Sequence, residues 1–310
     1  MTERALVVGG TGFLGKHVCD ALAAAGWDTV IASRRPGAGA VVLDAERSIR
    51  AELADALTRL EPALVVNAVG LIWRNDPPAM VVANTVVPEQ IAMAMADAEY
   101  RGRLVHLGSC LEYGPVFPPD AIDELTPLKP ESAYGRSKLA GTRRLEAATR
   151  AYQLDVVLLR VFNAVGAGMD PASVLGGTVQ TLLHAQHDGT CARIDLLDLR
   201  QHRDYVDARD VADAVLAAVE LPRSTGIRVF NIGSAVARTA HEVVRLLADT
   251  SGVAYRISIV PVAAGTARST GASWQLADTR RALEVMGWSA NRSITDTVHY
   301  IWTAAKGEPS

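Results

Sequence analysis

Glycines spaced three residues apart, directly after a short apolar run, constrain the fold of this chain more than any other feature. Residues 5–8 are apolar, and Gly9, Gly12 and Gly15 follow before a helical pattern begins. Gly9 allows a strand to turn sharply, Gly12 lets backbone N–H groups approach a pyrophosphate, and Gly15 lets the next helix lie close to the sheet. The N-terminus of that helix favours negative charge. The pattern therefore predicts a phosphate-binding strand–turn–helix unit.

Strand-like apolar runs alternate with helix-like segments over much of the chain. Such alternation predicts an α/β fold with a Rossmann-type doubly wound parallel sheet. The strand-like runs are almost wholly apolar, as expected where helices cover both faces of a sheet. The expected strands are residues 5–8, 29–32, 41–43, 64–68, 104–107, 156–161 and 229–232, and the expected helices are residues 16–25, 51–60, 84–98, 132–148 and 207–219.

The pattern loosens after residue 163, into stretches that contain Gly and Pro and a polar stretch over residues 195–203. We interpret these as substrate-binding insertions together with a smaller C-terminal α/β lobe. We therefore expect residues 1–163 and 205–232 to form a dinucleotide-binding Rossmann domain. Residues 164–204 and 233–310 are expected to form a substrate-binding lobe.

The charge balance argues against binding to nucleic acid or to an acidic membrane surface. The 310 residues carry a formal net charge of −3, with 31 Lys and Arg interspersed among 34 Asp and Glu.

Three widely separated cysteines argue against a disulfide framework and for a reducing compartment. The longest apolar stretch, residues 63–73, is too short to span a bilayer, and the early glycine motif leaves no room for a signal peptide. We expect a cytoplasmic protein.

The end of the second predicted strand bears on which dinucleotide is bound. Sites for NAD place an acidic residue here, on the ribose 2′-hydroxyl, but this chain has Ser33, Arg34 and Arg35. A serine hydroxyl and guanidinium groups can bind a 2′-phosphate through charge-assisted hydrogen bonds, so the pattern favours NADP(H) over NAD(H). The alternative is a solvated Arg pair in a surface turn. Asp44, after the third predicted strand, could bind the adenine amino group or cap a helix.

Tyr134 and Lys138 are four residues apart in a predicted helix, so their side chains share one face. A phenol is a poor proton donor at neutral pH, and a nearby ammonium group favours its ionised form. Ser109 directly follows a predicted strand, at the edge where α/β sheets bind ligands. A ketone that is being reduced needs a hydroxyl donor beside the proton-donating tyrosine. The alternatives are a surface Tyr/Lys pair and a serine in an ordinary turn.

Several motifs in a fixed order resemble those of the extended short-chain dehydrogenases/reductases, the superfamily of sugar-nucleotide epimerases, dehydratases and reductases. The resemblance covers nearly the whole chain. Besides the glycine motif, Ser109 and the Tyr134/Lys138 pair, it rests on Tyr113-Gly114, on residues 160–166, 203–207 and 231–233, and on Ala277-Asp278 leading to Gly287-Trp288. Residues 106–116 also resemble the corresponding stretch of dTDP-4-keto-6-deoxyhexose 4-ketoreductases, enzymes of deoxysugar pathways in antibiotic biosynthesis.

The resemblance implies roles for individual residues. Ser109, Tyr134 and Lys138 correspond to the catalytic trio. Asn163 and Arg203 would hold the diphosphate of a sugar nucleotide, and Arg268 resembles a second phosphate-binding arginine; without the resemblance, both arginines would be ordinary solvated residues. The predicted cofactor site comprises Gly9, Thr11, Gly12, Phe13, Leu14, Gly15, Ser33, Arg34, Arg35, Asp44, Asn67, Ala68, Val69, Asn84, Tyr134 and Lys138.

Residues next to Ser109 favour one reaction type within the superfamily. Dehydratases have an acidic pair directly after this position, whereas this chain has Cys110 and Leu111, which disfavours dehydration. We assign Cys110 to the substrate site, with simple packing as the favoured alternative. A 4-epimerase retains NAD⁺, whereas a reductase consumes a hydride in each cycle and draws on NADPH.

We therefore expect NADPH-dependent reduction of the C4 ketone of a nucleotide-linked 4-keto-6-deoxyhexose, with dTDP as the expected nucleotide. The alternatives are an NAD-retaining sugar-nucleotide 4-epimerase and a catalytically silent dinucleotide-binding scaffold or sensor. No metal site is expected: His241-Glu242 begins like a zinc-binding helix motif, but Arg245 stands where the second histidine is required. The helical segments 84–98 and 132–148 could form a four-helix bundle in a homodimer, as family members often do.

Overall fold

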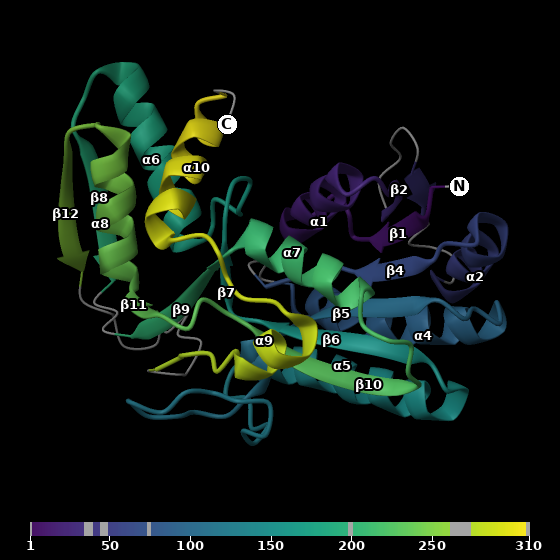
Figure 1. The fold of residues 1–310 in the computed structure, drawn as a ribbon. Coiled ribbons are helices and arrows are strands. Elements are labelled where there is room, and N and C mark those ends of the chain that lie inside the picture. The colour runs from purple at the N-terminus through teal and green to yellow at the C-terminus, as the bar shows by residue number, and fades with distance from the viewer. Residues whose placement is uncertain are drawn as a thin grey trace.

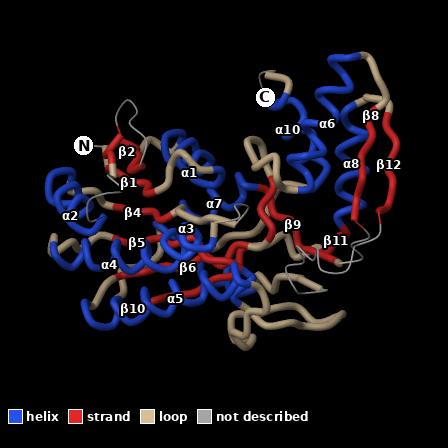
Figure 2. Tube along the Cα trace, turned by 180° about the vertical axis from the view of Figure 1, so that it is seen from behind, coloured by secondary structure: helices blue, strands red, loops and turns tan. Residues whose placement is uncertain are grey.

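The structure is a computed structural model that describes residues 2–33, 40–43, 49–72, 76–197, 201–260 and 274–307. A larger lobe built on a central sheet and a smaller helical lobe lie side by side, with a short sheet between them (Figures 1 and 2). The chain crosses between the lobes more than once, because α7 and β10 belong to the larger lobe although they follow β8 in the sequence.

Seven strands form the central sheet in the order β10-β6-β5-β4-β1-β2-β3, and every neighbouring pair is parallel. The strand order reverses between β1 and β4, the point at which a doubly wound sheet binds ligands. The predicted Rossmann-type fold is therefore confirmed. The strands are β1 (Arg4–Val8), β2 (Asp28–Ser33), β3 (Ala40–Val42), β4 (Leu64–Asn67), β5 (Arg103–Ser109), β6 (Asp155–Val161) and β10 (Gly226–Ile232).

Helices cover both faces of this sheet, which explains why its strands are apolar throughout (Figure 1). On one face lie α1 (Phe13–Ala24) and α7 (Ala208–Val219), with α9 (Arg280–Met286) near the β10 edge. On the other face lie α2 (Ile49–Leu60), α4 (Val87–Asp97) and α5 (Ala133–Tyr152). The 3₁₀ turn η2 (Cys110–Glu112) directly follows β5.

One helical run is longer than the sequence pattern predicted. The helix α3 (Pro77–Val81), the π-helical turn η1 (Val82–Val86) and α4 are continuous over Pro77–Asp97. By length and composition alone this run could cross a membrane. However, Val87, Ile91 and Met95 are buried in the core between α4 and the sheet. The run is therefore a core helix of the larger lobe.

The smaller lobe has its own core, in which three helices pack against a two-stranded parallel sheet. Its elements are α6 (Val174–Asp188), α8 (Ala240–Ser251), α10 (Ile294–Ala305), β8 (Ala192–Leu197) and β12 (Tyr255–Val260). The sheet between the lobes has the order β11-β9-β7, formed by β11 (Ala237–Thr239), β9 (His202–Asp207) and β7 (Asn163–Val165). The exact boundaries of the two predicted domains stay a prediction.

A buried ion pair joins the first residues of two neighbouring strands of the central sheet, β5 and β6. Arg103 at the start of β5 is only 1% exposed and donates to the Asp155 carboxylate over 2.8 Å. Its remaining N–H groups donate to the carbonyl oxygens of Ala218, Val219 and Pro222. The guanidinium therefore joins β5 and β6 to the end of α7, and its polar atoms are paired as burial requires.

We expect Arg103→Met to lower the free energy of unfolding by about 1–3 kcal/mol, because it leaves buried carbonyl groups without donors. The Asp155 carboxylate keeps a second partner in this variant, since Arg228 also donates to it over 2.8 Å. Urea unfolding followed by circular dichroism measures this. Arg4→Met is the matched control, since the Arg4–Asp28 pair is well exposed and such pairs contribute about 1 kcal/mol or less. Equal losses in the two variants would contradict the argument.

Candidate functional site

The turn after β1 has the close backbone contacts that the glycine spacing predicted. Gly9 has a φ of +84°, which favours glycine, and its N–H donates to the Ala32 carbonyl over 2.9 Å. A Cβ on Gly15 would lie 2.1 Å from the Gly9 carbonyl oxygen, so α1 can approach the turn only without a side chain there. Gly12 begins α1 and provides no side-chain cap. The first N–H groups of α1 are therefore available to an anion such as a pyrophosphate.

The residues that end and follow the neighbouring strand β4 lie at the same edge of the sheet. The Asn67 side-chain oxygen accepts from the Val69 N–H, and its Nδ2 donates to His106 Nδ1 over 2.9 Å. Burial and the nearby Lys138 hold the pKa of His106 well below its ordinary value, so the ring is neutral and can accept this bond. Val69 in turn lies against Gly9, because a Cβ on Gly9 would be 2.9 Å from its Cγ2.

Asn84 in η1 braces this edge. Its side chain exchanges hydrogen bonds with the backbone N–H and C=O of Leu71 and donates to Ser137 Oγ on α5, each over 3.0 Å. Because both ends of the amide are bound to protein groups, the structure gives Asn84 a bracing role, and direct cofactor contact stays a prediction. Cofactor contact also stays a prediction for four residues that follow β1 or β4, namely Thr11, Phe13, Leu14 and Ala68.

Several predicted residues cannot be compared with the structure. Ser33 ends β2 as expected and is buried. Arg34, Arg35, Asp44 and Arg268 lie outside the described residues.

The three predicted catalytic side chains meet at the carboxyl end of β5. Ser109 ends the strand, and its side chain is hydrogen-bonded to Tyr134 on α5. Lys138 is 2% exposed and donates from Nζ to the Leu107 carbonyl over 2.7 Å. Ser109 Oγ accepts from the Leu111 N–H, which leaves its own O–H to donate.

The electrostatics of this trio follow from burial. Burial raises the pKa of the Tyr134 phenol well above its ordinary value, and the Ser109 hydrogen bond lowers it. Burial also lowers the pKa of Lys138 to about 8, while the Glu112 carboxylate acts in the opposite direction. The phenol is therefore protonated at neutral pH, and it lies on the same helix face as an ammonium group that can stabilise its anion.

A second group of predicted residues lies on the sheet between the lobes. Asn163 at the start of β7 donates to the Asp204 carbonyl over 3.0 Å and to Gln275 Oε1 over 3.1 Å. Arg203 on β9 is only 8% exposed, and burial lowers its pKa. The interpretation of Arg203 as an ordinary solvated arginine is therefore wrong, because its side chain is buried.

Cys110 is 3% exposed and packs with Tyr113, Ile122 and Phe162. Burial raises the pKa of its thiol far above the usual value, so the side chain is a neutral packing group. Ala277 belongs to the same cluster, and its N–H donates to Asp204 on β9 over 3.0 Å, so the end of β5 lies close to the sheet between the lobes. A substrate contact by Cys110 stays a prediction.

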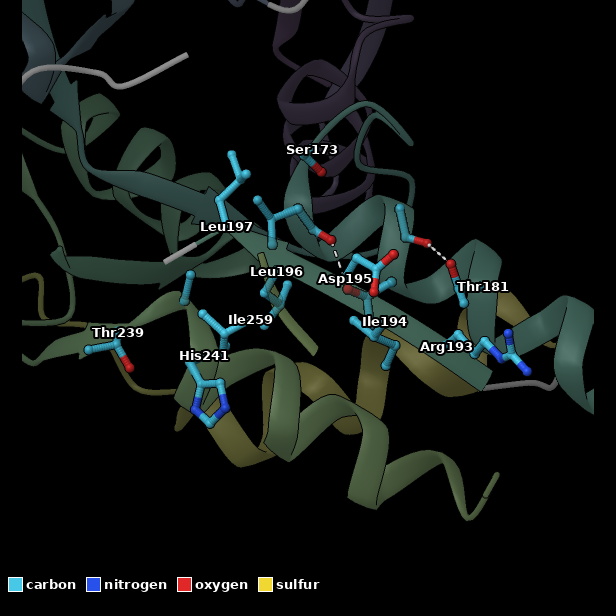
Figure 3. A pocket seen from close by; sticks show the side chains of 14 residues that line it. Ser173, Thr181, Arg193, Ile194, Asp195, Leu196, Leu197, Thr239, His241 and Ile259 are labelled. Atoms are coloured by element: carbon cyan, nitrogen blue, oxygen red, sulfur yellow. Dashed lines mark hydrogen bonds between the residues drawn. The ribbon is translucent and has the colours of Figure 1, made fainter. Parts of the chain in front are cut away.

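Sequence reasoning missed a large pocket in the smaller lobe. It has a volume of about 630 Å³, a size typical of small-molecule sites. Figure 3 shows its wall formed by β8 from Arg193 to Leu197, by Thr181 of α6 and by His241 at the start of α8. These residues match no short motif, so only the fold brings them together.

The pocket adjoins the small sheet between the lobes. The pocket reaches Thr239, the β11 residue after Arg238, and Arg238 pairs with Arg203 on β9. Arg203 therefore lies in the same small sheet as the pocket residue Thr239, on the neighbouring strand. Among the described residues, no group of three or more His, Cys, Asp or Glu side chains is placed to hold a metal ion.

Comparison with known proteins gives consistent matches over most of the chain or nearly all of it. The model of the NAD dependent epimerase/dehydratase family matches residues 5–233. The dTDP-6-deoxy-L-talose 4-dehydrogenase (NAD(P)(+)) of Kitasatospora kifunensis is 36% identical over 311 residues, covering 99% of this chain and 96% of that protein. The UDP-glucose 4-epimerase of Azospirillum brasilense is 31% identical over 334 residues, covering 93% and 87%.

Among solved structures, MoeE5 in complex with UDP-glucuronic acid and NAD is similar in fold, with a TM-score of 0.82 and 25% sequence identity. The match covers 98% of this chain and 99% of that one. Both lobes therefore have counterparts in a solved sugar-nucleotide complex.

We expect Gly15→Ala to lower the free energy of unfolding by about 1–3 kcal/mol, because the new methyl group would force α1 away from the Gly9 carbonyl. Urea unfolding without any dinucleotide measures this. Gly70→Ala, at the same sheet edge, is the control: its Cβ would lie 3.8 Å from the nearest atom, an ordinary contact. A Gly15→Ala protein as stable as this control would show that the close contact has no energetic weight.

Proposed function

This chain belongs to the NAD dependent epimerase/dehydratase family, as its motifs predicted, and we propose that it is an NADPH-dependent reductase of a nucleotide-linked 4-keto-6-deoxyhexose. The coarse class, an NAD(P)-dependent oxidoreductase of the sugar-nucleotide epimerase and dehydrogenase type, follows from the family and the full-length relative. The observation that carries the proposal is the meeting of Ser109, Tyr134 and Lys138 at the carboxyl end of β5.

Position C4 is supported by the names of two relatives. One is a 4-dehydrogenase of a dTDP-6-deoxysugar, and the other is a 4-epimerase of a UDP-sugar. Oxidation of a C4 hydroxyl and reduction of a C4 ketone pass through the same transition state, so a site that stabilises one stabilises the other. Reduction is the direction we propose, because Ser33, Arg34 and Arg35 favour the 2′-phosphate of NADPH.

The described residues suit a dinucleotide. A Cβ at Gly9 or Gly15 would push the turn away from β4 or from α1, and the start of α1, which has no side-chain cap, can bind phosphate. We assign the pyrophosphate to this turn, the adenosine ribose to the end of β2 near Ser33, and the nicotinamide ribose to Lys138. When bound, NADPH supplies the hydride that adds to the carbonyl carbon.

The residues of the trio divide the remaining chemistry. The Tyr134 hydroxyl donates a proton to the carbonyl oxygen, and the Ser109 hydroxyl donates a hydrogen bond to the same oxygen. The Lys138 ammonium stabilises the phenolate that remains until solvent returns the proton.

We assign the nucleotide part of the substrate to the pocket of the smaller lobe. Three of its lining side chains, Val174, Leu197 and Ile259, are apolar yet well exposed, which is typical of a surface that binds a ligand. Arg203 on β9 and Asn163 on β7 belong to the sheet between the lobes, and we assign to them the diphosphate that joins the base to the sugar. We propose that Arg268 adds a second cation there.

Tyr134→Phe tests the reductase directly. We expect kcat for the reduction of dTDP-4-keto-6-deoxyglucose with NADPH to fall about 10²–10⁴-fold, because the proton donor is lost, while NADPH still binds. NADPH oxidation at 340 nm and fluorescence titration measure the two quantities. Tyr152→Phe, at the exposed end of the same helix, should leave kcat unchanged. Normal turnover in Tyr134→Phe would overturn the mechanism.

The pH dependence follows from Lys138. Because a lysine is charged below its pKa, the ammonium is lost as the pH rises through about 8. We expect kcat for reduction to fall above this pH, in a profile of kcat measured from about pH 6 to about pH 10. Lys138→Met should be slower at every pH and should lack the alkaline fall. An unchanged alkaline limb in that variant would assign the limb to another group.

The second candidate function is an NAD-retaining 4-epimerase, which the similarity to a UDP-glucose 4-epimerase favours. Denaturing the purified protein and identifying the released nucleotide separates the two, since an epimerase retains tightly bound NAD⁺. A silent scaffold or sensor would bind dinucleotide without oxidising NADPH in the presence of any 4-keto sugar nucleotide.

A further inference from the structure

We propose that Glu112 is a positioning residue that holds Ser109 and the helix of Tyr134 and Lys138 in fixed relation to each other. The proposal rests on the proposed function, because it assigns a task in the reaction of that trio. Glu112 ends η2, three residues after Ser109, and its side chain is completely buried. A buried carboxylate is stable only when its oxygens are paired, so its partners show what it holds together.

The first partner is the backbone of Ser109. Glu112 Oε1 accepts from the Ser109 N–H over 2.9 Å. The Ser109 side chain in turn accepts from the Leu111 N–H, so the two residues cap the turn reciprocally. The carboxylate therefore limits the position of the serine that binds the substrate oxygen.

The second partner lies on α5. Thr142 is one helical turn after Lys138, on the side of α5 that faces β5, and it is fully buried. Its Oγ1 donates to Glu112 Oε2 over 3.0 Å. The same carboxyl group thus binds the serine turn through one oxygen and the helix of the tyrosine and lysine through the other.

The third partner fixes the carboxylate itself. Arg160 on β6 is 3% exposed and donates from Nε to Glu112 Oε2 over 3.2 Å. Its NH1 donates to the Tyr113 hydroxyl over 3.0 Å, and that hydroxyl donates to Asn231 Oδ1 on β10 over 2.7 Å. The Glu112 carboxylate is therefore bound from the β6 side of the sheet as well.

This arrangement matters for the reaction because the trio comes from separate elements. Ser109 belongs to the end of β5, whereas Tyr134 and Lys138 belong to α5, and the substrate oxygen must contact both hydroxyl groups at once. Small displacements of reacting groups are costly for rate. A bond that sets the spacing between the elements should therefore affect kcat more than substrate binding.

The obvious variant, Glu112→Gln, leaves the buried Arg160 guanidinium without its carboxylate and so tests folding as much as catalysis. Thr142→Val is the sharper variant, because it removes only the hydroxyl that links α5 to Glu112. Thr149→Val is the matched control: Thr149 is also buried on α5, but its hydroxyl donates to the Leu145 carbonyl of its own helix. Thr142→Ser keeps the hydroxyl and serves as the rescue.

We expect Thr142→Val to lower kcat about 10-fold with KM and NADPH affinity within about 2-fold of the wild type, and Thr142→Ser to restore kcat. Amide hydrogen exchange of the substrate-free protein should be faster over residues 107–113 in Thr142→Val only. Thr149→Val should change neither quantity. Equal loss of kcat in the two valine variants, or unchanged exchange and kcat in Thr142→Val, would overturn the proposal.

The exchange measurement separates this proposal from the proposed function. If the wild-type protein reduces no 4-keto sugar nucleotide, the reductase assignment fails. Faster exchange in Thr142→Val alone would then still support the role of Glu112 in holding the Ser109 turn, and unchanged exchange would overturn it.

Discussion

The parallel direction of the seven central strands is the constraint on which the rest of the structure depends. Because all of them run the same way, the turns after β1, β4 and β5 open at one edge of the sheet. The Gly9 turn, the Asn67 side chain and Ser109 therefore share that edge, although they are far apart in the sequence. Helix α5 packs across the same sheet and brings Tyr134 and Lys138 to Ser109.

Two buried carboxylates organise the polar groups that this arrangement brings together. Glu112 binds the turn after β5 to α5 and β6, as described above. Asp204 on β9 plays a comparable part between the lobes, because its oxygens accept from the N–H groups of Ser234, Ala235 and Ala277. Both side chains are completely buried. Asp204 thus replaces water for three backbone N–H groups, and Glu112 replaces it for one backbone N–H, one hydroxyl group and one guanidinium.

Local patterns in the sequence predicted much of this structure. Continuous apolar runs identified the strands of the central sheet, and the spacing of Gly9, Gly12 and Gly15 identified the turn. The Ser-x-x-Glu spacing of a capping box is also readable in residues 109–112, but the partners of Glu112 are 30 and 48 residues away and become neighbours only on folding.

The environment of Arg203 could not be read from its sequence neighbours. It is buried at 8% exposure in a sheet whose three strands, β7, β9 and β11, come from separate parts of the chain. The pocket on β8 was missed for the same reason, since its wall combines segments with no shared local pattern.

That pocket has a consequence for how such a protein can diversify. The lining residues that the structure describes belong to segments 173–197, 239–241 and 259, and none of these described residues belongs to the strands or the helix that carry Ser109, Tyr134 and Lys138. Because we assign the nucleotide to this pocket, we expect substitutions in its wall to alter which ligand is selected while the hydroxyl, phenol and ammonium groups keep their places. Ligand preference and the catalytic residues can therefore evolve separately in this chain, because the pocket and the trio belong to lobes with separate hydrophobic cores.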